Sequence, residues 1–168
     1  MSSADPEQRF AVVEAYPVET WQPTLCGDID IVIHADGSWW HEGVRIDRQS
    51  LIALFAKLLR HEDGGYYLIT PVEKLKIAVE DLPFLAVDFD REGDALVFTT
   101  DHGDRIILGP EHPLAFDGED LRPRLRVRHN LWARVTRAAW YRLVEIADVR
   151  ADQIIIGSLI FDLKPSVI

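Results

Sequence analysis

The sequence predicts an α+β protein made of two fused, similarly built β-rich subdomains, each with one main helix. Segments in which every second residue is apolar, separated by turn dipeptides, indicate antiparallel strands in both halves of the chain. A strand–strand–helix–strand pattern also occurs twice, over residues 29–70 and over residues 125–159. We interpret the repetition as an internal duplication; the alternative, a chance alignment of a common pattern, stays open.

The first copy begins with isoleucines at alternate positions over residues 29–33, which is typical of a strand with one buried face. Asp36 and Gly37 predict a hairpin turn, because glycine adopts positive φ at little cost. Residues 39–43 are therefore expected to return as the partner strand.

A helix is expected next, with Asp47 as its N-cap. Its apolar stripe has helical spacing and consists of Leu51, Leu54, Phe55, Leu58 and Leu59. Gly64 and Gly65 should end this element. Residues 66–70 then form a strand that stops at Pro71.

From Leu75 onward the apolar residues recur at every second position, which predicts an antiparallel meander. Within it, Leu85, Val87 and Phe89 are expected to share one face. Turn residues separate the runs at 81–83, 91–94 and 101–104. The turn-rich stretch 109–123 is expected to be irregular.

The second copy places strands at residues 125–128 and 131–135, joined at His129-Asn130. Thr136 is the expected N-cap of its helix. The helical stripe consists of Trp140, Leu143, Val144 and Ala147, and residues 154–159 are expected to form one strand. We divide the chain into an N-terminal α+β subdomain, residues 1–73, and an antiparallel β subdomain with a C-terminal helix, residues 74–168.

The composition is that of a globular protein, with 48% hydrophobic and 10% aromatic residues in 168. The net charge of −10 argues against binding to nucleic acid or to anionic membranes. The single cysteine, Cys26, excludes an internal disulfide and a multi-thiolate zinc site, and we expect it to be a small buried thiol. The chain shows neither a signal peptide nor a spanning segment, so a cytoplasmic location is expected.

Three groups of residues are candidates for a binding site. The first is the hairpin segment Trp39, Trp40, His41, Glu42 and Gly43, where one indole of the strand points away from the core unless a second layer covers it. A half-exposed indole can stack on a planar ligand. The alternative is that both faces are covered.

The second group is Thr70, Pro71, Val72, Glu73 and Lys74, where the helix-bearing half joins the meander. Thr70 and Lys74 can donate to an anionic group, and Glu73 can accept from a ribose or an amine. The alternative is a rigid connector, fixed by the proline, with solvated charges.

The third group is a row of seven arginines without an intervening acidic residue: Arg122, Arg124, Arg126, Arg128, Arg134, Arg137 and Arg142. The first four alternate along a strand and so line one face, where guanidinium groups can bind phosphate or carboxylate in bidentate fashion. The alternative is that they pair with acidic residues of the chain.

Several of these segments resemble a bacterial domain-of-unknown-function family, number 1285. The resemblance covers residues 23–163 and rests on residues 26–30, 36–39 and 64–70, on Thr-Pro-Val-Glu-Lys at 70–74, and on Asn130, Arg137, Ala138 and Tyr141. The matching signature positions are Trp39, Gly43, Thr70, Pro71, Glu73 and Lys74.

The resemblance implies two similarly built α+β subdomains, the second superficially like a pleckstrin-homology barrel. It also implies a ligand site where the subdomains meet, for a nucleotide-like molecule, and a signalling role. It brings no catalytic residues, so none are assigned.

We therefore expect a non-catalytic module that binds an anionic, nucleotide-like small molecule. The expected ligand-binding residues are Trp39, His41, Gly43, Thr70, Pro71, Glu73, Lys74, Arg126, Arg128 and Asn130. No cofactor or metal site is expected, because metal-ligand spacings are absent. A hydrolase acting on a small phosphorylated metabolite, and a protein–protein adaptor that uses an exposed strand edge, are the alternatives.

Overall fold

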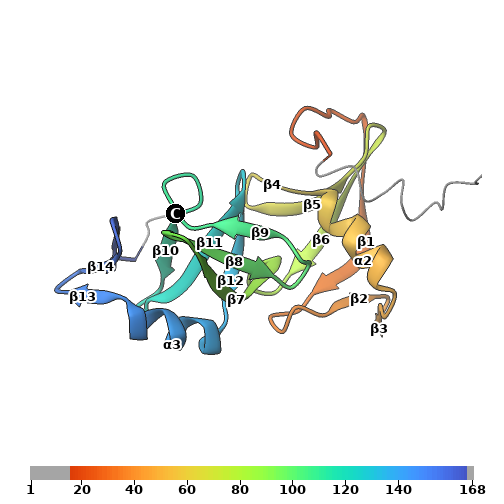
Figure 1. Ribbon diagram of the computed structural model, residues 1–168. Helices are drawn as coiled ribbons and strands as arrows, with labels where there is room; N and C mark the ends of the chain where they lie inside the picture. Colours follow the sequence, from red (N-terminus) through yellow and green to blue (C-terminus); the bar gives the residue numbers. More distant parts are fainter. Residues whose placement is uncertain (1–15, 166–168) are drawn as a thin grey trace, which may run out of the picture. The chain divides into compact units, whose positions relative to one another are not determined.

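The computed structural model describes residues 16–165, which divide into two units (Figure 1). Unit 1 comprises residues 16–30 and 46–77, and unit 2 comprises residues 31–45 and 78–165. Strand β1 (Leu25–Ile33) begins in unit 1 and ends in unit 2. Each unit is therefore assembled from two separate stretches of the chain.

Unit 1 consists of one helix and a set of hairpins. Its elements are the first part of β1, α2 (Gln49–Lys57), β4 (Leu59–Glu62), β5 (Gly65–Ile69) and β6 (Glu73–Val79), whose last two residues belong to unit 2. The strand order is β1-β6-β5-β4, with antiparallel pairing of β4 with β5 and of β5 with β6. The core of the unit includes Ile52, Ala56, Leu59 and Ile69, all buried.

Two expectations about the first helix are wrong. Its N-cap is Arg48 rather than Asp47, and no side chain caps it. The helix ends at Lys57, so that Leu59 is not on its stripe but opens strand β4, fully buried. Asp63-Gly64 has φ of 49° and 76° and forms the two-residue turn of the β4–β5 hairpin.

Unit 2 begins with a small antiparallel hairpin. The second part of β1 pairs with β2 (Trp39–His41), which in turn pairs with β3 (Val44–Arg45). Gly37 has φ of 87° in the first turn, and Gly43 has φ of 77° in the second. The predicted strand at residues 39–43 is thus confirmed for its first three residues only.

The larger part of unit 2 is a six-stranded sheet, called sheet B. Its strands are β7 (Phe84–Glu92), β8 (Ala95–Thr100), β9 (Arg105–Ile107), β10 (Leu114–Asp117), β11 (Arg122–Arg128) and β12 (Leu131–Val135). The order is β10-β11-β12-β7-β8-β9. Neighbouring strands are antiparallel except β12 and β7, which are parallel and join the two three-stranded halves.

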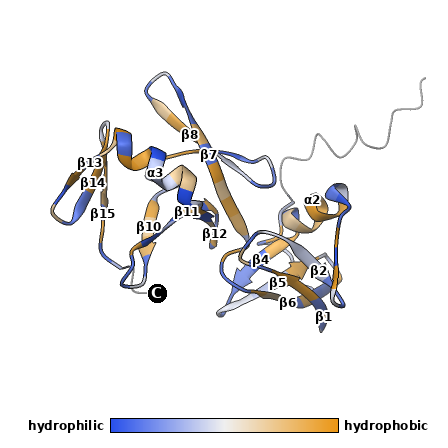
Figure 2. Cartoon of the chain, turned by 90° about the horizontal axis from the view of Figure 1, so that it is seen from below, coloured by the Kyte–Doolittle hydropathy of each residue, from blue (hydrophilic) through white to orange (hydrophobic). Residues whose placement is uncertain are grey.

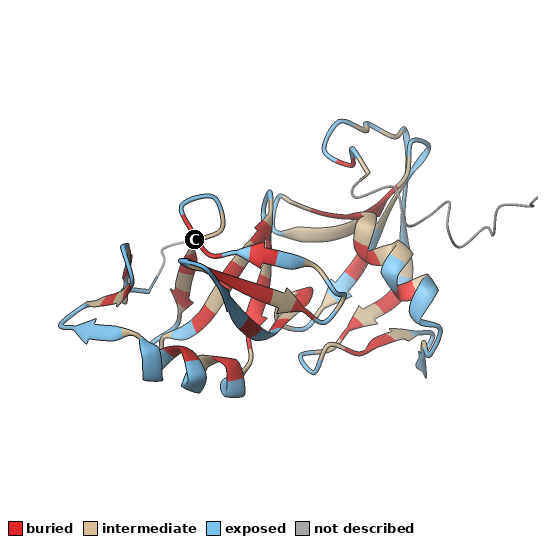
Figure 3. Cartoon of the chain, in the orientation of Figure 1, coloured by how far each residue is buried: buried red, intermediate tan, exposed pale blue. Residues whose placement is uncertain are grey.

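Two details of sheet B differ from the expectation. The stretch 109–123 is not wholly irregular, because it contains β10. A register shift between Ala86 and Asp88 interrupts the alternation in β7, so Phe84, Ala86 and Phe89 are the buried residues while Val87 is 38% exposed. Figure 3 shows the burial of the central strands.

The chain then forms helix α3 (Arg137–Ile146) and a three-stranded antiparallel sheet, sheet C. Its strands are β13 (Asp148–Arg150), β14 (Gln153–Ile156) and β15 (Leu159–Asp162), in that order. Thr136 is confirmed as the N-cap, since its hydroxyl accepts the Ala139 N–H. The single strand expected at 154–159 is instead a hairpin. Polar and apolar stretches both occur along α3 (Figure 2).

The predicted class is confirmed. The chain has an α+β fold with two similar β-rich subdomains, each with one helix. None of the helices within residues 16–165 has both the length and the apolar character needed to cross a bilayer.

Candidate functional site

The aromatic hairpin places its first indole in the core of unit 2. Trp39 is fully buried, and its ring meets the edge of the His102 ring at a centroid distance of 6.2 Å. Trp40 is partly buried and donates its indole N–H to Ser38 Oγ at 2.9 Å. The alternative in which both faces of the strand are covered therefore holds for Trp39, whose ring has no face open to a ligand.

The remaining predicted residues of the hairpin lie on the surface. His41 Nε2 is 3.9 Å from Glu42 Oε1, and both side chains are exposed. Glu42 has φ of 50°, so it forms the β2–β3 turn together with Gly43. The left-handed backbone of this turn accounts for the glycine.

A polar cluster lies beneath Trp39. His102, 9% exposed in its side chain, is in edge contact with Trp39 and Phe84, and its Nε2 lies 3.8 Å from Asp101 Oδ1. Burial raises the pKa of the Asp101 carboxyl, although the charge of His102 and the Leu85 N–H oppose this. The contacts with Trp39 and Phe84 attach the His102 ring to the buried aromatic residues of unit 2.

The segment 70–74 is a hairpin turn within unit 1, between β5 and β6. Thr70 Oγ1 accepts the N–H groups of Glu73 at 3.0 Å and Val72 at 3.3 Å, and the Thr70 N–H donates to the Glu73 carbonyl at 2.9 Å. The Thr70 hydroxyl thus holds the turn together. Pro71 and Glu73 are exposed, whereas Lys74 is partly buried and lines a pocket.

Lys74 lines an open pocket of about 320 Å³ in unit 1. The lining residues are Glu19, Gln22, Pro23, Cys26, Arg60, Glu62 and Lys74. Of these, only Lys74 was predicted as a site residue. Cys26 was expected to be buried; this is wrong, because the thiol is exposed on the pocket wall.

The charged wall of the pocket is a chain of three side chains. Glu62 contacts the Lys74 ammonium with one oxygen and lies 3.0 Å from Arg60 Nη2 with the other. The Lys74 ammonium also lies over the Tyr67 ring, 4.2 Å from its centroid. Two cations therefore share a single carboxylate.

Arg60 is fixed by its surroundings. Its side chain is 8% exposed, and Nη1 donates to the carbonyls of Val18 at 3.0 Å and Trp21 at 2.7 Å. These bonds attach the segment before β1 to strand β4. The Asp63-Gly64 dipeptide is a sequence signal for part of this site. It predicts a hairpin turn, and the strand before that turn has Arg60 and Glu62 on one face.

The arginine row lies on β11 as predicted, with Arg122, Arg124, Arg126 and Arg128 alternating with buried residues. Most of these side chains are engaged. Arg122 contacts Asp81 at 3.1 Å, and Arg124 pairs with Asp117 at 3.0 Å and lies 4.1 Å from the Trp132 ring centroid.

The later part of the row is engaged as well. Arg126 donates its Nε–H to the His129 carbonyl at 2.7 Å, and Arg128 lies over the Phe84 ring. Asn130 occupies the β11–β12 turn beside His129, whose φ is 46°. Pairing with acidic residues, the alternative to a free row, therefore describes Arg122 and Arg124, whereas Arg126 is bound to a backbone carbonyl.

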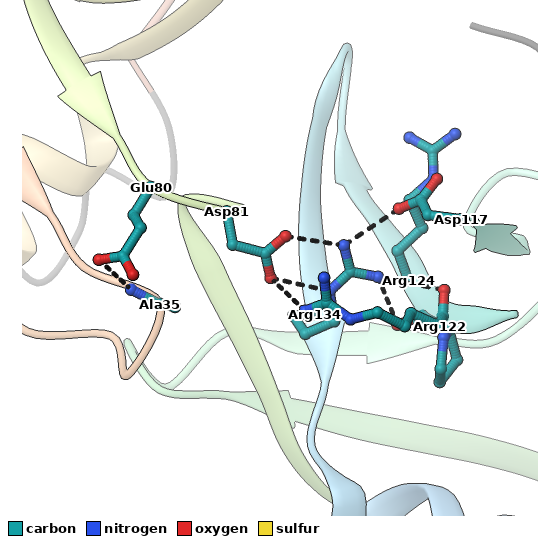
Figure 4. Close-up of polar contacts among 8 residues, drawn as sticks. Ala35, Glu80, Asp81, Asp117, Arg122, Arg124 and Arg134 are labelled. Atoms are coloured by element: carbon teal, nitrogen blue, oxygen red, sulfur yellow. Dashed lines mark hydrogen bonds and ion pairs between the residues drawn. The ribbon is translucent and has the colours of Figure 1, made fainter. Parts of the chain in front are cut away.

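Arg134 is the centre of the best-formed polar network (Figure 4). Its fork meets both oxygens of Asp81 at 2.9 Å, and Nη2 also donates to Asp117 at 3.1 Å. Nη1 donates to the carbonyls of Arg122 and Pro123. All five N–H groups of the guanidinium thus have acceptors.

The network shifts the pKa values of its members. Burial raises the pKa of Asp81, but the hydrogen bonds and charge of Arg134 and the charge of Arg122 outweigh it, so the pKa is lowered. The pKa of Arg134 is raised, since the two carboxylates outweigh its burial. The guanidinium of Arg134 therefore retains no donor for a ligand.

Within residues 16–165, no three His, Cys, Asp or Glu side chains are grouped so that they could hold a metal ion. A hydrolase would need acids gathered in one cleft, but Asp28 and Glu73 are exposed residues of unit 1, while Glu42 is an exposed residue of unit 2.

The comparisons with known proteins agree with one another. A crystal structure of a DUF1285 family protein from Silicibacter pomeroyi DSS-3 is 34% identical, with 97% of each chain covered and a TM-score of 0.79. A second one, from Shewanella baltica OS155, is 32% identical over 68% of this chain and 90% of that chain, with a TM-score of 0.57. No curated protein matches the chain.

The family domains cover most of the chain. The N-terminal domain of DUF1285, a domain of unknown function, matches residues 16–82, and the C-terminal domain of this protein family of unknown function matches residues 83–159. The boundary between them falls beside Asp81, the residue that Arg134 holds. On this evidence the chain belongs to the DUF1285 family.

Proposed function

We propose that the chain is a cytoplasmic, non-catalytic module that binds a small anionic, nucleotide-like molecule in the pocket of unit 1 and has a signalling role. One observation carries the proposal: two cations, Arg60 and Lys74, line a single pocket and share the carboxylate of Glu62. The volume of about 320 Å³ lies at the lower end of the range for small-molecule sites, roughly 300–1,000 Å³.

Lys74 is the residue that would meet the anionic group. An ammonium has three donors, and its side chain is 22% exposed, whereas Arg60 is held by two carbonyls. A phosphate or carboxylate arriving beside Lys74 would become a second acceptor for the ammonium. Even if the ammonium turns from Glu62 to the ligand, Glu62 keeps its contact with Arg60, so neither buried charge is left without a partner.

Two other lining residues suit the polar remainder of such a molecule. These are Glu19 and Gln22, and both are exposed. A carboxylate accepts from amino and hydroxyl groups, and a side-chain amide both donates and accepts. These are the hydrogen-bonding groups that a base and a ribose require.

The sole cysteine provides a direct test, because Cys26 lines the pocket and is exposed. We expect AMP, GMP or a cyclic nucleotide to slow the reaction of this thiol with a disulfide reagent and to raise the melting temperature. At a ligand concentration of about 100 Kd the stabilisation is about 2.7 kcal/mol. Inorganic phosphate in the same assay separates recognition of the phosphate from recognition of the nucleoside.

A matched pair of variants locates the effect. Lys74→Ala should lose both protection and stabilisation, and Lys76→Ala, an exposed lysine on the same strand but outside the pocket lining, should retain both. If no nucleotide protects Cys26 or shifts the melting temperature of the wild type, the proposal is refuted. Nucleotide binding that persists in Lys74→Ala would refute the assignment of the site.

The hydrolase alternative has less support. The carboxyl groups whose pKa values are displaced include Asp36, Asp81 and Asp101, which lie in unit 2, outside the pocket. A pocket acid with a displaced pKa is what such a reaction would require.

A further inference from the structure

Strand β13 is an unpaired edge of sheet C. The sheet order β13-β14-β15 gives it one neighbour, and all three of its residues, Asp148, Val149 and Arg150, are exposed (Figure 3). Val149 is 50% exposed, a high value for a valine in a strand. Within residues 16–165, no other strand is paired with this edge.

The main chain of Val149 points to the free side. Arg150 pairs with Gln153 across the two-residue turn 151–152, and Asp148 pairs with Ile155. In a two-residue hairpin the residues flanking the turn exchange both hydrogen bonds, and the direction alternates along the strand. The N–H and C=O of Val149 therefore face away from β14 and have no partner on the sheet.

The sequence of this edge is complementary to itself in the antiparallel direction. A second copy paired about Val149 sets Asp148 of each copy opposite Arg150 of the other, and Val149 opposite Val149. Within one copy, Arg150 Nε already lies 2.7 Å from Asp148 Oδ2, on one strand face. The remaining N–H groups of the fork are available to the carboxylate of the second copy.

We propose that β13 is a homodimerisation edge, which joins two copies of this chain through an antiparallel β13–β13 pair with twofold symmetry. The pair has two reciprocal Val149 hydrogen bonds and two Asp148–Arg150 ion pairs, one on each side of the axis. It joins two three-stranded sheets into one of six strands. This edge addition between copies is independent of the proposed ligand pocket.

The other edge strands of unit 2 lack this property. Strand β9 (Arg105–Ile107) ends the order of sheet B, and antiparallel self-pairing about Ile106 would set Arg105 against the exposed Ile107. Like the two-residue strand β3, it offers no charge complement to a second copy. Strands β10 and β15, the remaining edges, each contain one acidic and no basic residue, so among the edge strands of unit 2 charge complementarity singles out β13.

Charge reversal gives a test that does not depend on loss of folding. Asp148→Arg makes the edge Arg-Val-Arg and Arg150→Asp makes it Asp-Val-Asp, so each variant alone opposes like charges. Mixed in equal amounts, the two variants regain both ion pairs. By sedimentation equilibrium at low ionic strength, each single variant should weaken dimerisation about tenfold or more, and the mixture should restore it.

Two further variants complete the experiment. Val149→Pro removes the outward N–H without touching the β13–β14 ladder, and should abolish the dimer while the melting temperature stays near that of the wild type. Glu111→Arg, the same charge change as Asp148→Arg in an exposed loop, should dimerise like the wild type. A wild type that stays monomeric at several hundred micromolar overturns the proposal, as does a dimer that the β13 variants leave unchanged.

Discussion

The Asp81–Arg134 contact allows a quantitative prediction, because its geometry is complete. Asp81 is 17% and Arg134 11% exposed, and two hydrogen bonds of 2.9 Å join them. Asp81→Asn removes the charge and places an amide N–H group against the guanidinium. Breaking one side of a buried pair costs about 3–5 kcal/mol. Arg134 keeps Asp117 and the carbonyls of Arg122 and Pro123, so we expect a loss of roughly 2–4 kcal/mol.

The loss should depend on pH. The folded state lowers the pKa of Asp81, so the stability from this carboxylate is fully present above its unfolded value, about 3.9, and disappears as the pH falls through the folded value. The difference between the wild type and Asp81→Asn should therefore be constant near neutral pH. It should shrink progressively below about pH 4.

Urea unfolding followed by tryptophan fluorescence and by circular dichroism measures this difference. Asp152→Asn is the matched control, because the Asp152–Lys164 pair has a similar distance, 2.9 Å, but both side chains are more than half exposed. Its effect should be small beside that of Asp81→Asn, because an exposed ion pair contributes little to stability. A loss of less than about 1 kcal/mol for Asp81→Asn, or a difference that does not change with acid, would refute the reasoning.

Three other substitutions test separate parts of the fold by the same unfolding assay. Arg60→Met leaves the carbonyls that it holds and Glu62 without their buried donor, and should cost about 3 kcal/mol or more; a neutral result would mean that water replaces the guanidinium. Thr136→Ala removes the hydroxyl that caps α3 and should cost about 1 kcal/mol, with Thr136→Ser close to the wild type. Gly37→Ala places a Cβ 2.9 Å from Asp101 Oδ2 at a φ of 87°, so a cost of about 1–3 kcal/mol is expected; no loss would show that the turn relaxes.

Local signals in the sequence predicted the elements that depend on local chemistry. The cap at Thr136 and the turn at Gly37 follow from one side chain or one backbone angle, and both are confirmed. The parallel pairing of β12 with β7 could not be predicted in this way, because it joins residues about fifty positions apart with no short-range signature. The register shift within β7 could not be predicted either, because an extra residue in one strand leaves the apolar pattern ambiguous.

The prediction that Leu59 belongs to the first helix was wrong for a different reason. Leu58 and Leu59 continue the helical stripe, and they also continue a strand, because a short apolar run fits both periods. The two-residue turn that Asp63-Gly64 predicts distinguishes the helix from the strand, because such a turn requires a strand, β4, directly before it. The same signal would have placed Arg60 and Glu62 on one face of β4, but it carries no information on Lys74, which lies on β6.

The residue types that suggested a site are largely those that the scaffold uses for itself. Tryptophan and arginine are rich in contact area and donors, which makes them suited to ligands and equally to cores and ion-pair networks. Trp39 is fully buried and Arg134 is saturated, so neither retains a group for a partner. Lys74 differs, because its partly exposed ammonium contacts a shared carboxylate and an aromatic face while it lines an open pocket. Residual hydrogen-bonding capacity beside a pocket, rather than residue type, is therefore the argument for Lys74 in the proposed site.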